Sequence, residues 1–421
     1  MYQSSSHRPR HQGGGSTRFH SARPAQRGSF SHQRSTSFRS GPVRGQARGN
    51  NRFAGKYIDP SKFIKKAVIT EEVENFVPEH KFVDFAVSEK LKLNITRKGY
   101  QLPTPIQDKA IPHILRGEDV VGIANTGTGK TAAFLIPLIE KVSKLKQEKV
   151  LIMVPTRELA LQIDEELKAF VRGFGIFSVC CVGGANIRAQ LAQLRHHNNF
   201  IIGTPGRLKD LVERRAINLT EFKTVVLDEA DRMLDMGFIN DMKFMLGQMP
   251  SPRHTLFFSA TLSPEIERLI HSFLRQPARI SVKTQETAAN VEQDVVRVSG
   301  ANKFVKLLEL LRQADFNRVL VFARTKHGSE KLSRDLKKEG ISTESIHGNK
   351  SQSQRQRALA AFKQGLTQVL VATDVAARGL DISDISHVIN YDIPATYEDY
   401  IHRIGRTGRG NKRGKALTFV E

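Results

Sequence analysis

The chain has 421 residues, 39% of them hydrophobic, so it can bury a large apolar core, and its length exceeds what one compact core usually holds. Its 65 Lys and Arg residues outweigh 42 Asp and Glu residues, and the formal net charge of +23 favours a polyanionic partner, either a nucleic acid or an anionic membrane surface. No apolar run reaches the roughly 18 to 20 residues that span a bilayer, and the first residues lack the apolar segment of a secretory signal, so we expect a soluble, cytoplasmic protein without a membrane partner.

Residues 1–56 are rich in Ser, Gly, Arg, His and Gln, and no acidic residue precedes Asp59. Such a segment cannot bury enough apolar surface to offset its ordering entropy, so we predict a disordered basic tail. Its Arg-Gly pairs and scattered Phe residues resemble tails that bind RNA by charge and loose stacking. A solvated spacer is the alternative.

Beyond about residue 80, short runs rich in Val and Ile alternate with longer stretches of helical periodicity, which is typical of parallel βαβ units. Expected strands fall at 119–123, 150–154, 200–203, 224–227 and 256–258, and a second series at 295–298, 319–322, 369–371, 387–389 and 417–420. A polar stretch at 281–293 separates the two series. We therefore predict an α/β protein with a tail and lead-in at 1–80, a first domain at 81–283, a linker at 284–293 and a second domain at 294–421.

The two cysteines, Cys180 and Cys181, are adjacent in an apolar run at 177–182 that predicts a buried strand. A core role is therefore favoured over redox or metal chemistry.

Residues 124–131 read Ala-Asn-Thr-Gly-Thr-Gly-Lys-Thr between an expected strand and an expected helix. Glycines let backbone N–H groups approach phosphate oxygens, and helix-start amides add positive potential. Lys130 is expected to pair with the β- and γ-phosphates of ATP, and the Thr131 hydroxyl to ligate Mg²⁺. Ala124 stands where the strict pattern has Gly. The other nucleotide contacts are expected from the middle of the loop: Thr126, Gly127, Thr128 and Gly129.

The sequence Asp-Glu-Ala-Asp at 228–231 follows the apolar strand at 224–227, at the strand end where α/β sheets place their ligand chemistry. Hydrolysis of ATP needs a carboxylate to hold Mg²⁺ and a second group to orient the attacking water. Asp228 suits the first role and Glu229 the second.

With these motifs the chain, from about residue 82 to its end, resembles the DEAD-box RNA helicases of superfamily 2. The resemblance implies two tandem RecA-like domains with mainly parallel sheets. Residues 99–107 match the Q motif of that family, which implies that Gln107 reads the adenine edge while Tyr100 and Phe82 pack about the base. An amide both donates and accepts, so it can select adenine. Asn125 departs from the Gln usual in the family, and we expect slightly altered loop packing with activity retained.

Further roles come from the same resemblance. Ser259 and Thr261, in the Ser-Ala-Thr sequence, are implied to couple hydrolysis to strand separation, and such small hydroxyl residues can hydrogen-bond a carboxylate such as Asp231. In the sequence His-Arg-Ile-Gly-Arg-Thr-Gly-Arg at 402–409, Arg406 and Arg409 are implied to be arginine fingers. Asp381 is implied to contact the ribose. Because the water-orienting group and the fingers lie on different domains, hydrolysis is expected to require closure.

RNA contacts are also implied by the resemblance. They fall on Pro155, Thr156, Arg157, Gly184, Thr204, Gly206 and Arg207 in the first domain and on Arg324, Thr325, Gln352, Arg355 and Thr373 in the second. These residue types grip a backbone without reading bases, so sequence-independent binding of single-stranded RNA and short duplexes is expected, with RNA distinguished from DNA by its 2′-hydroxyl groups. Residues 346–352 look most like the bacterial RhlE-like branch.

The expected function is therefore that of an ATP-dependent RNA helicase, a monomer that uses ATP and Mg²⁺ to unwind short duplexes locally or to remodel RNA–protein complexes. Ribosomal or RNA-decay assemblies are candidate partners. An ATP-gated RNA clamp that does not unwind and a DNA-dependent ATPase are the alternatives. The sequence leaves the RNA target and the pathway open.

Overall fold

The computed structural model describes residues 60–64, 76–125, 127–282, 291–299, 302–377, 382, 384–408 and 413–420. Four predicted features lie outside these residues: the tail at 1–56, the nucleotide contact Thr126, the ribose contact Asp381 and the arginine finger Arg409.

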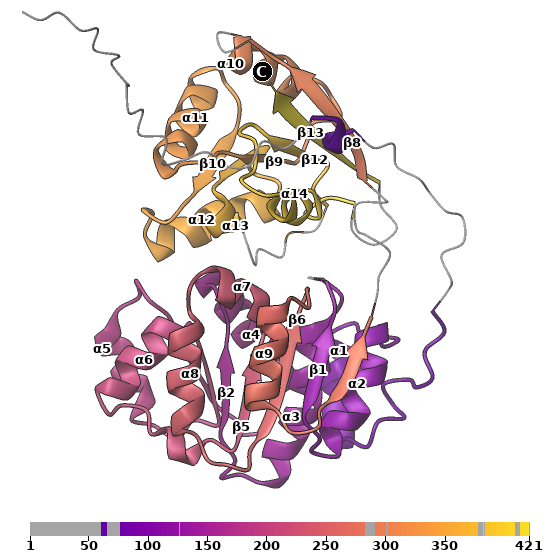
Figure 1. Ribbon diagram of the computed structural model, residues 1–421, viewed down its shortest axis with the longest axis vertical. Coiled ribbons are helices and arrows are strands. Elements are labelled where there is room, and N and C mark those ends of the chain that lie inside the picture. Colours follow the sequence, from indigo (N-terminus) through magenta and orange to yellow (C-terminus); the bar gives the residue numbers. More distant parts are fainter. Residues whose placement is uncertain are drawn as a thin grey trace, which may run out of the picture. The chain divides into compact units, whose positions relative to one another are not determined.

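The first domain is a seven-stranded sheet with the strand order β3-β4-β2-β5-β6-β1-β7 (Figure 1). Each neighbouring pair of strands is parallel. The strands are β1 (Val120–Ile123), β2 (Val150–Met153), β3 (Ser178–Cys181), β4 (Phe200–Gly203), β5 (Thr224–Leu227), β6 (His254–Ser259) and β7 (Ala278–Ser281). The helices are α1 (Glu89–Arg97), α2 (Pro105–Leu115), α3 (Lys130–Lys144), α4 (Arg157–Phe170), α5 (Ile187–Leu194), α6 (Pro205–Glu213), α7 (Ala230–Asp235), α8 (Ile239–Gln248) and α9 (Pro264–Phe273), with the 3₁₀ turn η2 (Leu219–Glu221).

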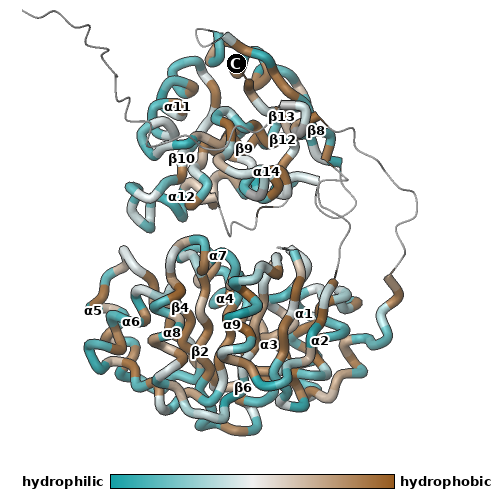
Figure 2. Tube along the Cα trace, in the orientation of Figure 1, coloured by the Kyte–Doolittle hydropathy of each residue, from teal (hydrophilic) through white to brown (hydrophobic). Residues whose placement is uncertain are grey.

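Successive strand residues face opposite sides of this sheet, and each side has its own apolar cluster. Leu151 packs with α6, α7, α8 and α9, whereas its neighbour Ile152 packs with α1, α2, α3 and α4. Strands buried on both faces need continuous apolar runs, which is why they are brown along their length in Figure 2.

The second domain is a six-stranded sheet with the order β10-β11-β9-β12-β13-β8, and its neighbouring strands are also parallel. The strands are β8 (Val291–Arg297), β9 (Val319–Phe322), β10 (Thr343–Ile346), β11 (Val369–Ala372), β12 (His387–Asn390) and β13 (Gly414–Val420). Helices α10 (Lys303–Leu311) and α11 (Lys326–Lys338) cover one face, and α12 (Gln352–Lys363), α13 (Asp374–Ala377) and α14 (Tyr397–Ile404) cover the other. The short helix η1 (Pro60–Phe63) lies beside β8.

The predicted α/β class with two RecA-like domains of parallel strands is confirmed. Two strands, β7 and β10, were not predicted. Strand β8 begins at Val291, so the second sheet starts ahead of the predicted boundary at residue 294. Residues 1–80 were predicted to form one tail and lead-in ahead of the first domain. The structure corrects this prediction for η1, which packs on the second domain.

The cysteine-bearing strand is an edge strand rather than a fully buried one. Cys181 is buried on one face of β3, and Cys180 is partly buried on the other. Burial raises the pKa of the Cys181 thiol to about 12 and raises the pKa of Cys180 further, so neither is a reactive thiolate near neutral pH. The predicted core role is confirmed.

Candidate nucleotide and RNA site

The carboxyl ends of the parallel strands gather the predicted site residues of the first domain at one edge of its sheet. The phosphate loop follows β1, the Asp-Glu-Ala-Asp sequence follows β5, and the Ser-Ala-Thr sequence closes β6, which lies between them in the sheet. The predicted RNA contacts follow β2, β4 and β3, which are also neighbours. The strand order therefore places the predicted nucleotide half of the site next to the predicted RNA half.

The phosphate loop turns sharply into α3. Gly127 and Gly129 have φ angles of 87° and 92°, in the left-handed region that favours glycine. Lys130 is buried, and its Nζ donates to the carbonyl oxygen of Ala124 at 2.8 Å, while the Thr128 hydroxyl donates to the Asn125 carbonyl at 2.8 Å. A glycine turn that ends in the first amides of a helix, with an ammonium group inside it, fits a chain of phosphates.

Gln107 supports this loop from α2. Its Oε1 accepts a hydrogen bond from the backbone N–H of Thr104 at 3.0 Å, and its Nε2 donates to the carbonyl oxygen of Gly129 at 3.0 Å. A Cβ atom at Gly129 would lie 2.4 Å from that Nε2. The amide keeps one further N–H and one lone pair, and recognition of adenine through them stays a prediction.

The aromatic residues of the Q motif are packed against one another. Phe82 is buried, and its ring meets Tyr100 edge to face with centroids 5.7 Å apart. The Tyr100 hydroxyl donates to Glu166 Oε1 at 2.6 Å. The structure therefore gives both rings a packing role, and their contact with a base stays a prediction.

Carboxylates are concentrated after β5. Burial raises the pKa of Asp228 to about 6, with Glu229 and Asp231 adding to the rise and Lys130 opposing it. The Glu229 N–H donates to Asp228 Oδ1 at 2.9 Å. Glu229 has a φ of 53°, an unusual conformation for a non-glycine residue, and its carboxylate is paired with Arg232. A strained, buried carboxylate next to a second one is a common arrangement at functional sites.

Asp231 ties this loop to β6. Its Oδ2 accepts from the N–H groups of Ala260 and Thr261, both at 2.9 Å, and from the Thr261 hydroxyl at 3.1 Å. Burial disfavours its charge, but Lys130 and the N–H groups of Arg232 and Thr261 outweigh that penalty and hold the pKa of Asp231 below its usual range. The expected bond from this motif to Asp231 is confirmed for Thr261, whereas the Ser259 hydroxyl donates to the Thr261 carbonyl at 2.8 Å.

The donor set also fits Mg²⁺. Thr131 is the second residue of α3, and Asp228 lies within electrostatic reach of the preceding residue, Lys130. Among the described residues no group of three or more His, Cys, Asp and Glu side chains could hold a metal. One carboxylate and one hydroxyl suit Mg²⁺, which usually takes its remaining ligands from water and phosphate oxygens.

The residues of the first domain that are predicted to bind RNA lie at the starts of helices or at a glycine whose backbone a side chain approaches closely. Thr156 and Thr204 are the N-caps of α4 and α6, and Pro155 precedes the first of these helices. The Arg157 guanidinium covers Gly184, where a Cβ atom would lie 2.0 Å from Nη1. Gly206 lies in the first turn of α6, and the neighbouring Arg207 donates to Gln190 Oε1 at 2.8 Å. Helix-start amides beside arginines form a surface suited to phosphates.

In the second domain the predicted RNA residues follow β9, β10 and β11, which are adjacent strands. Arg324 and Thr325 follow β9, and Thr325 caps α11 by accepting from the Gly328 N–H at 2.9 Å. Thr373 follows β11. Gln352 and Arg355 lie one turn apart on α12, which follows β10. Arg406, the predicted arginine finger, follows α14 and is buried.

Comparisons with known proteins agree with this arrangement. Residues 104–269 match the DEAD/DEAH box helicase family, and residues 302–411 match the helicase conserved C-terminal domain. The chain is 46% identical to the ATP-dependent RNA helicase CshA of Listeria monocytogenes over 81% of its own length and 66% of that protein. It is 45% identical to the DEAD-box ATP-dependent RNA helicase CshA of Bacillus subtilis over 80% of its own length and 69% of that protein. These alignments span about two thirds of the relatives. The chain belongs to the DEAD-box RNA helicase family.

A solved structure of the DEAD-box type is also similar. The chain is 30% identical to S. cerevisiae Dbp5 bound to RNA and ADP BeF3, with a TM-score of 0.71 over 81% of this chain and 89% of that one. The two curated relatives carry the name CshA, so the family expectation is confirmed, whereas the expected RhlE-like branch is not supported at that finer level.

Two buried polar residues that bond to segments carrying predicted site residues were not singled out from the sequence. Arg403 is buried and binds both carboxylate oxygens of Asp374, at 2.5 and 2.8 Å, so it links α14 to the segment that follows β11. Gln190 holds Arg207 and donates to the Val182 carbonyl at 3.0 Å. Arg403 could have been found from the sequence because it lies within the 402–409 motif. No motif in the sequence marks Gln190.

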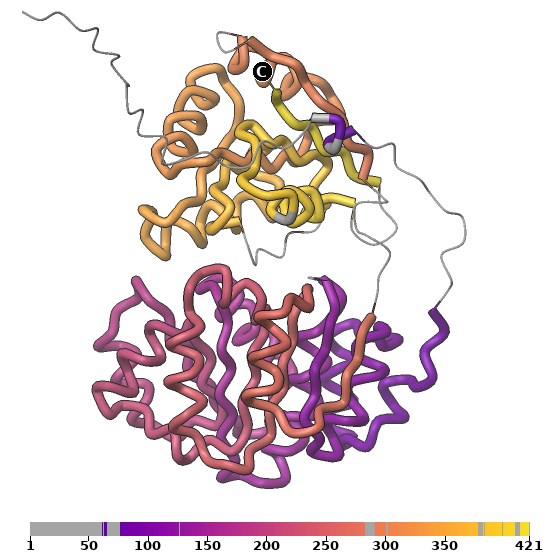
Figure 3. The backbone as a smooth tube through the Cα atoms, viewed as in Figure 1, coloured from indigo at the N-terminus to yellow at the C-terminus, as the bar shows by residue number. Residues whose placement is uncertain are grey.

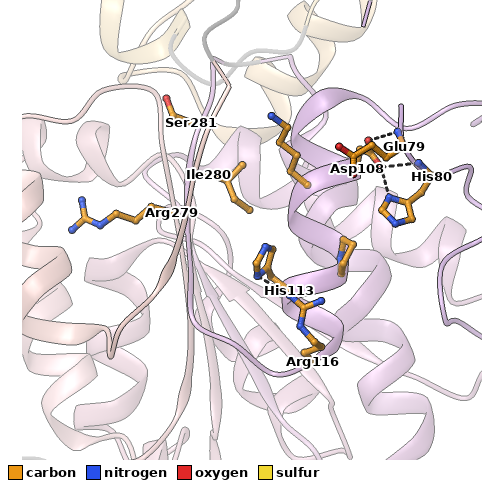
Figure 4. A pocket seen from close by; sticks show the side chains of 10 residues that line it. Glu79, His80, Asp108, His113, Arg116, Arg279, Ile280 and Ser281 are labelled. Atoms are coloured by element: carbon orange, nitrogen blue, oxygen red, sulfur yellow. Dashed lines mark hydrogen bonds and ion pairs between the residues drawn. The ribbon is translucent and has the colours of Figure 1, made fainter. Parts of the chain in front are cut away.

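A pocket of about 450 Å³ lies beside α2 and β7 (Figure 4). Asp108 accepts from the N–H groups of Glu79 at 2.8 Å and His80 at 3.1 Å and also meets His80 Nδ1 at 2.7 Å. Arg279 is paired with Glu267 at 2.8 Å. These contacts tie the segment ahead of α1 to α2, next to Gln107. Within the part of the chain that the structure describes, no helix combines the length and apolar character needed to cross a bilayer.

Proposed function

We propose that this chain is an RNA-dependent ATPase that grips RNA by its backbone and locally unwinds short duplexes or remodels RNA–protein complexes. The observation that carries this proposal is the common edge of the first sheet, where the phosphate loop and the carboxylates lie beside the helix starts predicted to bind RNA. The Asp231 bonds to Ala260 and Thr261 give the nucleotide half a direct connection to β6.

In this function Lys130 and the first amides of α3 bind the phosphates of ATP. Mg²⁺, held by Thr131 and Asp228, would neutralise developing charge on the phosphates. Glu229 accepts a hydrogen bond from the attacking water and orients it. Arg406 and Arg409 belong to the second domain, so they stabilise the transferred phosphoryl group only when the domains close.

The RNA surface would bind without reading sequence. Helix-start amides, threonine hydroxyls and arginines bind phosphates, and selection of RNA over DNA comes from contacts to 2′-hydroxyl groups. Closure on RNA and ATP bends one strand out of a short duplex, and hydrolysis reopens the domains.

Within the DEAD-box family, we propose that this chain groups with the CshA-type proteins, because it is 46% and 45% identical to two of them. A monomer acting in the cytoplasm, with ribosomal or RNA-decay assemblies as partners, completes the proposal.

The test compares ATP turnover by the full chain with RNA and with DNA of equal length and sequence, followed by displacement of a labelled strand from a short duplex. We expect stimulation by RNA alone and strand displacement that needs ATP. Equal stimulation by DNA would favour the DNA-dependent ATPase, and ATP-dependent RNA retention without displacement would favour the clamp.

A further inference from the structure

Phe63 precedes the first domain in the chain, yet its side chain is fully buried in the second domain. Its ring centroid lies 4.7 Å from that of Tyr400, with the planes inclined at 55°. The same apolar cluster includes Val291 of β8 and Ile404 of α14. Figure 3 shows η1 as the indigo turn against the orange β8. The next residue, Ile64, is 58% exposed, so this burial is specific to Phe63.

Tyr400 lies in the middle of α14, and its hydroxyl donates to Gln293 Oε1 of β8 at 3.0 Å. One turn further along the same helix, Arg403 binds Asp374 and donates to the Asp392 carbonyl at 2.6 Å. The helix is therefore fixed by rings and a hydroxyl at Tyr400 and by a guanidinium at Arg403. A helix held at two points one turn apart cannot rotate or slide without breaking one of them.

Arg406 follows the last residue of α14 by two positions, so its place depends on how the helix is seated. Among the described residues, Phe63 is the member of this cluster that comes from outside the second domain. Removing its ring would leave a void against Tyr400, so the packing that holds α14 at Tyr400 would be weakened and its last turn held less firmly.

We propose that Phe63 is a positioning residue for hydrolysis: it seats α14 through Tyr400 and thereby sets where Arg406 meets the phosphates. This inference rests on the finger role given to Arg406 above. The segment ahead of the first domain thereby contributes to the chemistry of the second domain.

The experiment measures RNA-stimulated ATP turnover of the full chain carrying Phe63→Ala, Phe63→Leu, Arg406→Ala or Phe63→Ala with Arg406→Ala. Displacement of a catalytic group by about 1 Å can lower turnover up to 100-fold, so we expect kcat of Phe63→Ala to fall roughly 10- to 100-fold. Affinity for ATP without RNA should stay unchanged, because Lys130 and its loop belong to the first domain. Phe63→Leu, which keeps an apolar side chain of similar size, should recover most of kcat. Ile64→Ala is the matched control and should equal the wild type.

The double variant separates positioning from a merely structural role. If Phe63 acts through Arg406, the double variant should turn over no more slowly than Arg406→Ala alone. A full multiplicative loss in the double variant, or wild-type kcat in Phe63→Ala beside a low kcat in Arg406→Ala, would overturn the proposal. Wild-type kcat in Arg406→Ala would instead overturn the finger role itself. Should Phe63→Ala fail to fold, Phe63→Val, which also leaves part of the space against Tyr400 empty, gives the same cycle with and without Arg406→Ala, and wild-type kcat in Phe63→Val alone would then overturn the positioning role.

Discussion

Asp231 is the residue whose replacement should separate ATP hydrolysis from strand separation. A single carboxylate oxygen, Oδ2, accepts three hydrogen bonds from the end of β6, two from backbone N–H groups and one from the Thr261 hydroxyl. Asp231→Ala removes the acceptor for all three. Thr261→Val removes the hydroxyl bond alone and leaves both N–H bonds in place.

The structure allows the two losses to be ranked. Hydrogen bonds to a charged group contribute about 1.5–3 kcal/mol each, and the lower end applies here because Thr261 is exposed. Thr261→Val should therefore lower the free energy of unfolding by about 1.5 kcal/mol. Asp231→Ala should lower it by about 2–4 kcal/mol, because two N–H groups also lose their partner.

The assay pairs thermal unfolding, followed by circular dichroism, with the number of duplexes displaced for each ATP hydrolysed. We expect that ratio to fall at least fivefold for Asp231→Ala and less for Thr261→Val. Ser272→Ala, which loses an exposed bond to the Arg268 carbonyl on α9 and none to Asp231, is the control and should keep a ratio close to the wild type. The reasoning would be refuted if Asp231→Ala kept both the wild-type ratio and the wild-type melting temperature.

Three further predictions concern turnover, nucleotide affinity and the tail. Glu229→Gln should cut ATP turnover by at least about 100-fold, because the amide keeps the shape of the side chain and loses the charge that orients water. Nucleotide affinity, followed with a fluorescent analogue, should stay near the wild type, and near wild-type turnover would contradict the assignment. Gly129→Ala should weaken nucleotide binding at least tenfold, because its Cβ would lie 2.4 Å from Gln107 Nε2 at a φ of 92°, whereas Gly247→Ala, with open space around it, should bind normally. Deleting residues 1–56 should flatten the slope of RNA affinity against salt concentration with little change in turnover at saturating RNA, and superimposable lines would identify a passive spacer.

The sequence predicted the central strands well and missed two of the four edge strands, β7 and β10. The strand at Val369–Ala372 is buried on both faces, so its apolar run is continuous and easily recognised. By contrast Ala278–Ser281 and Thr343–Ile346 close the ends of their sheets and contain polar residues, so no apolar run marks them. Their pairing depends on neighbours far away in the sequence, which local periodicity does not contain.

In the candidate site, too, features set by local sequence could be predicted and long-range contacts could not. The loop around Lys130 and the carboxylates Asp228 and Glu229 follow strands directly, so local order was enough to predict that they meet at one edge. Two contacts could not be predicted in this way. Gln107 supports Gly129 across 22 positions of the chain, and Phe63 meets Tyr400 from outside the second domain. Such long-range packing is decided by shape, and the sequence around either residue carries no sign of its partner.

The clustering of functional groups at the carboxyl ends of the strands leaves the opposite edge of the first sheet without such groups. The turn ahead of β2, with Lys146 and Gln147 exposed, and the turn ahead of β6, with Ser251 and Pro252 exposed, both lie at that opposite edge. A dye, an affinity tag or an inserted reporter attached there would report on the enzyme without contacting either substrate. The same property makes these turns the natural places where related chains can differ in length while the chemistry is kept.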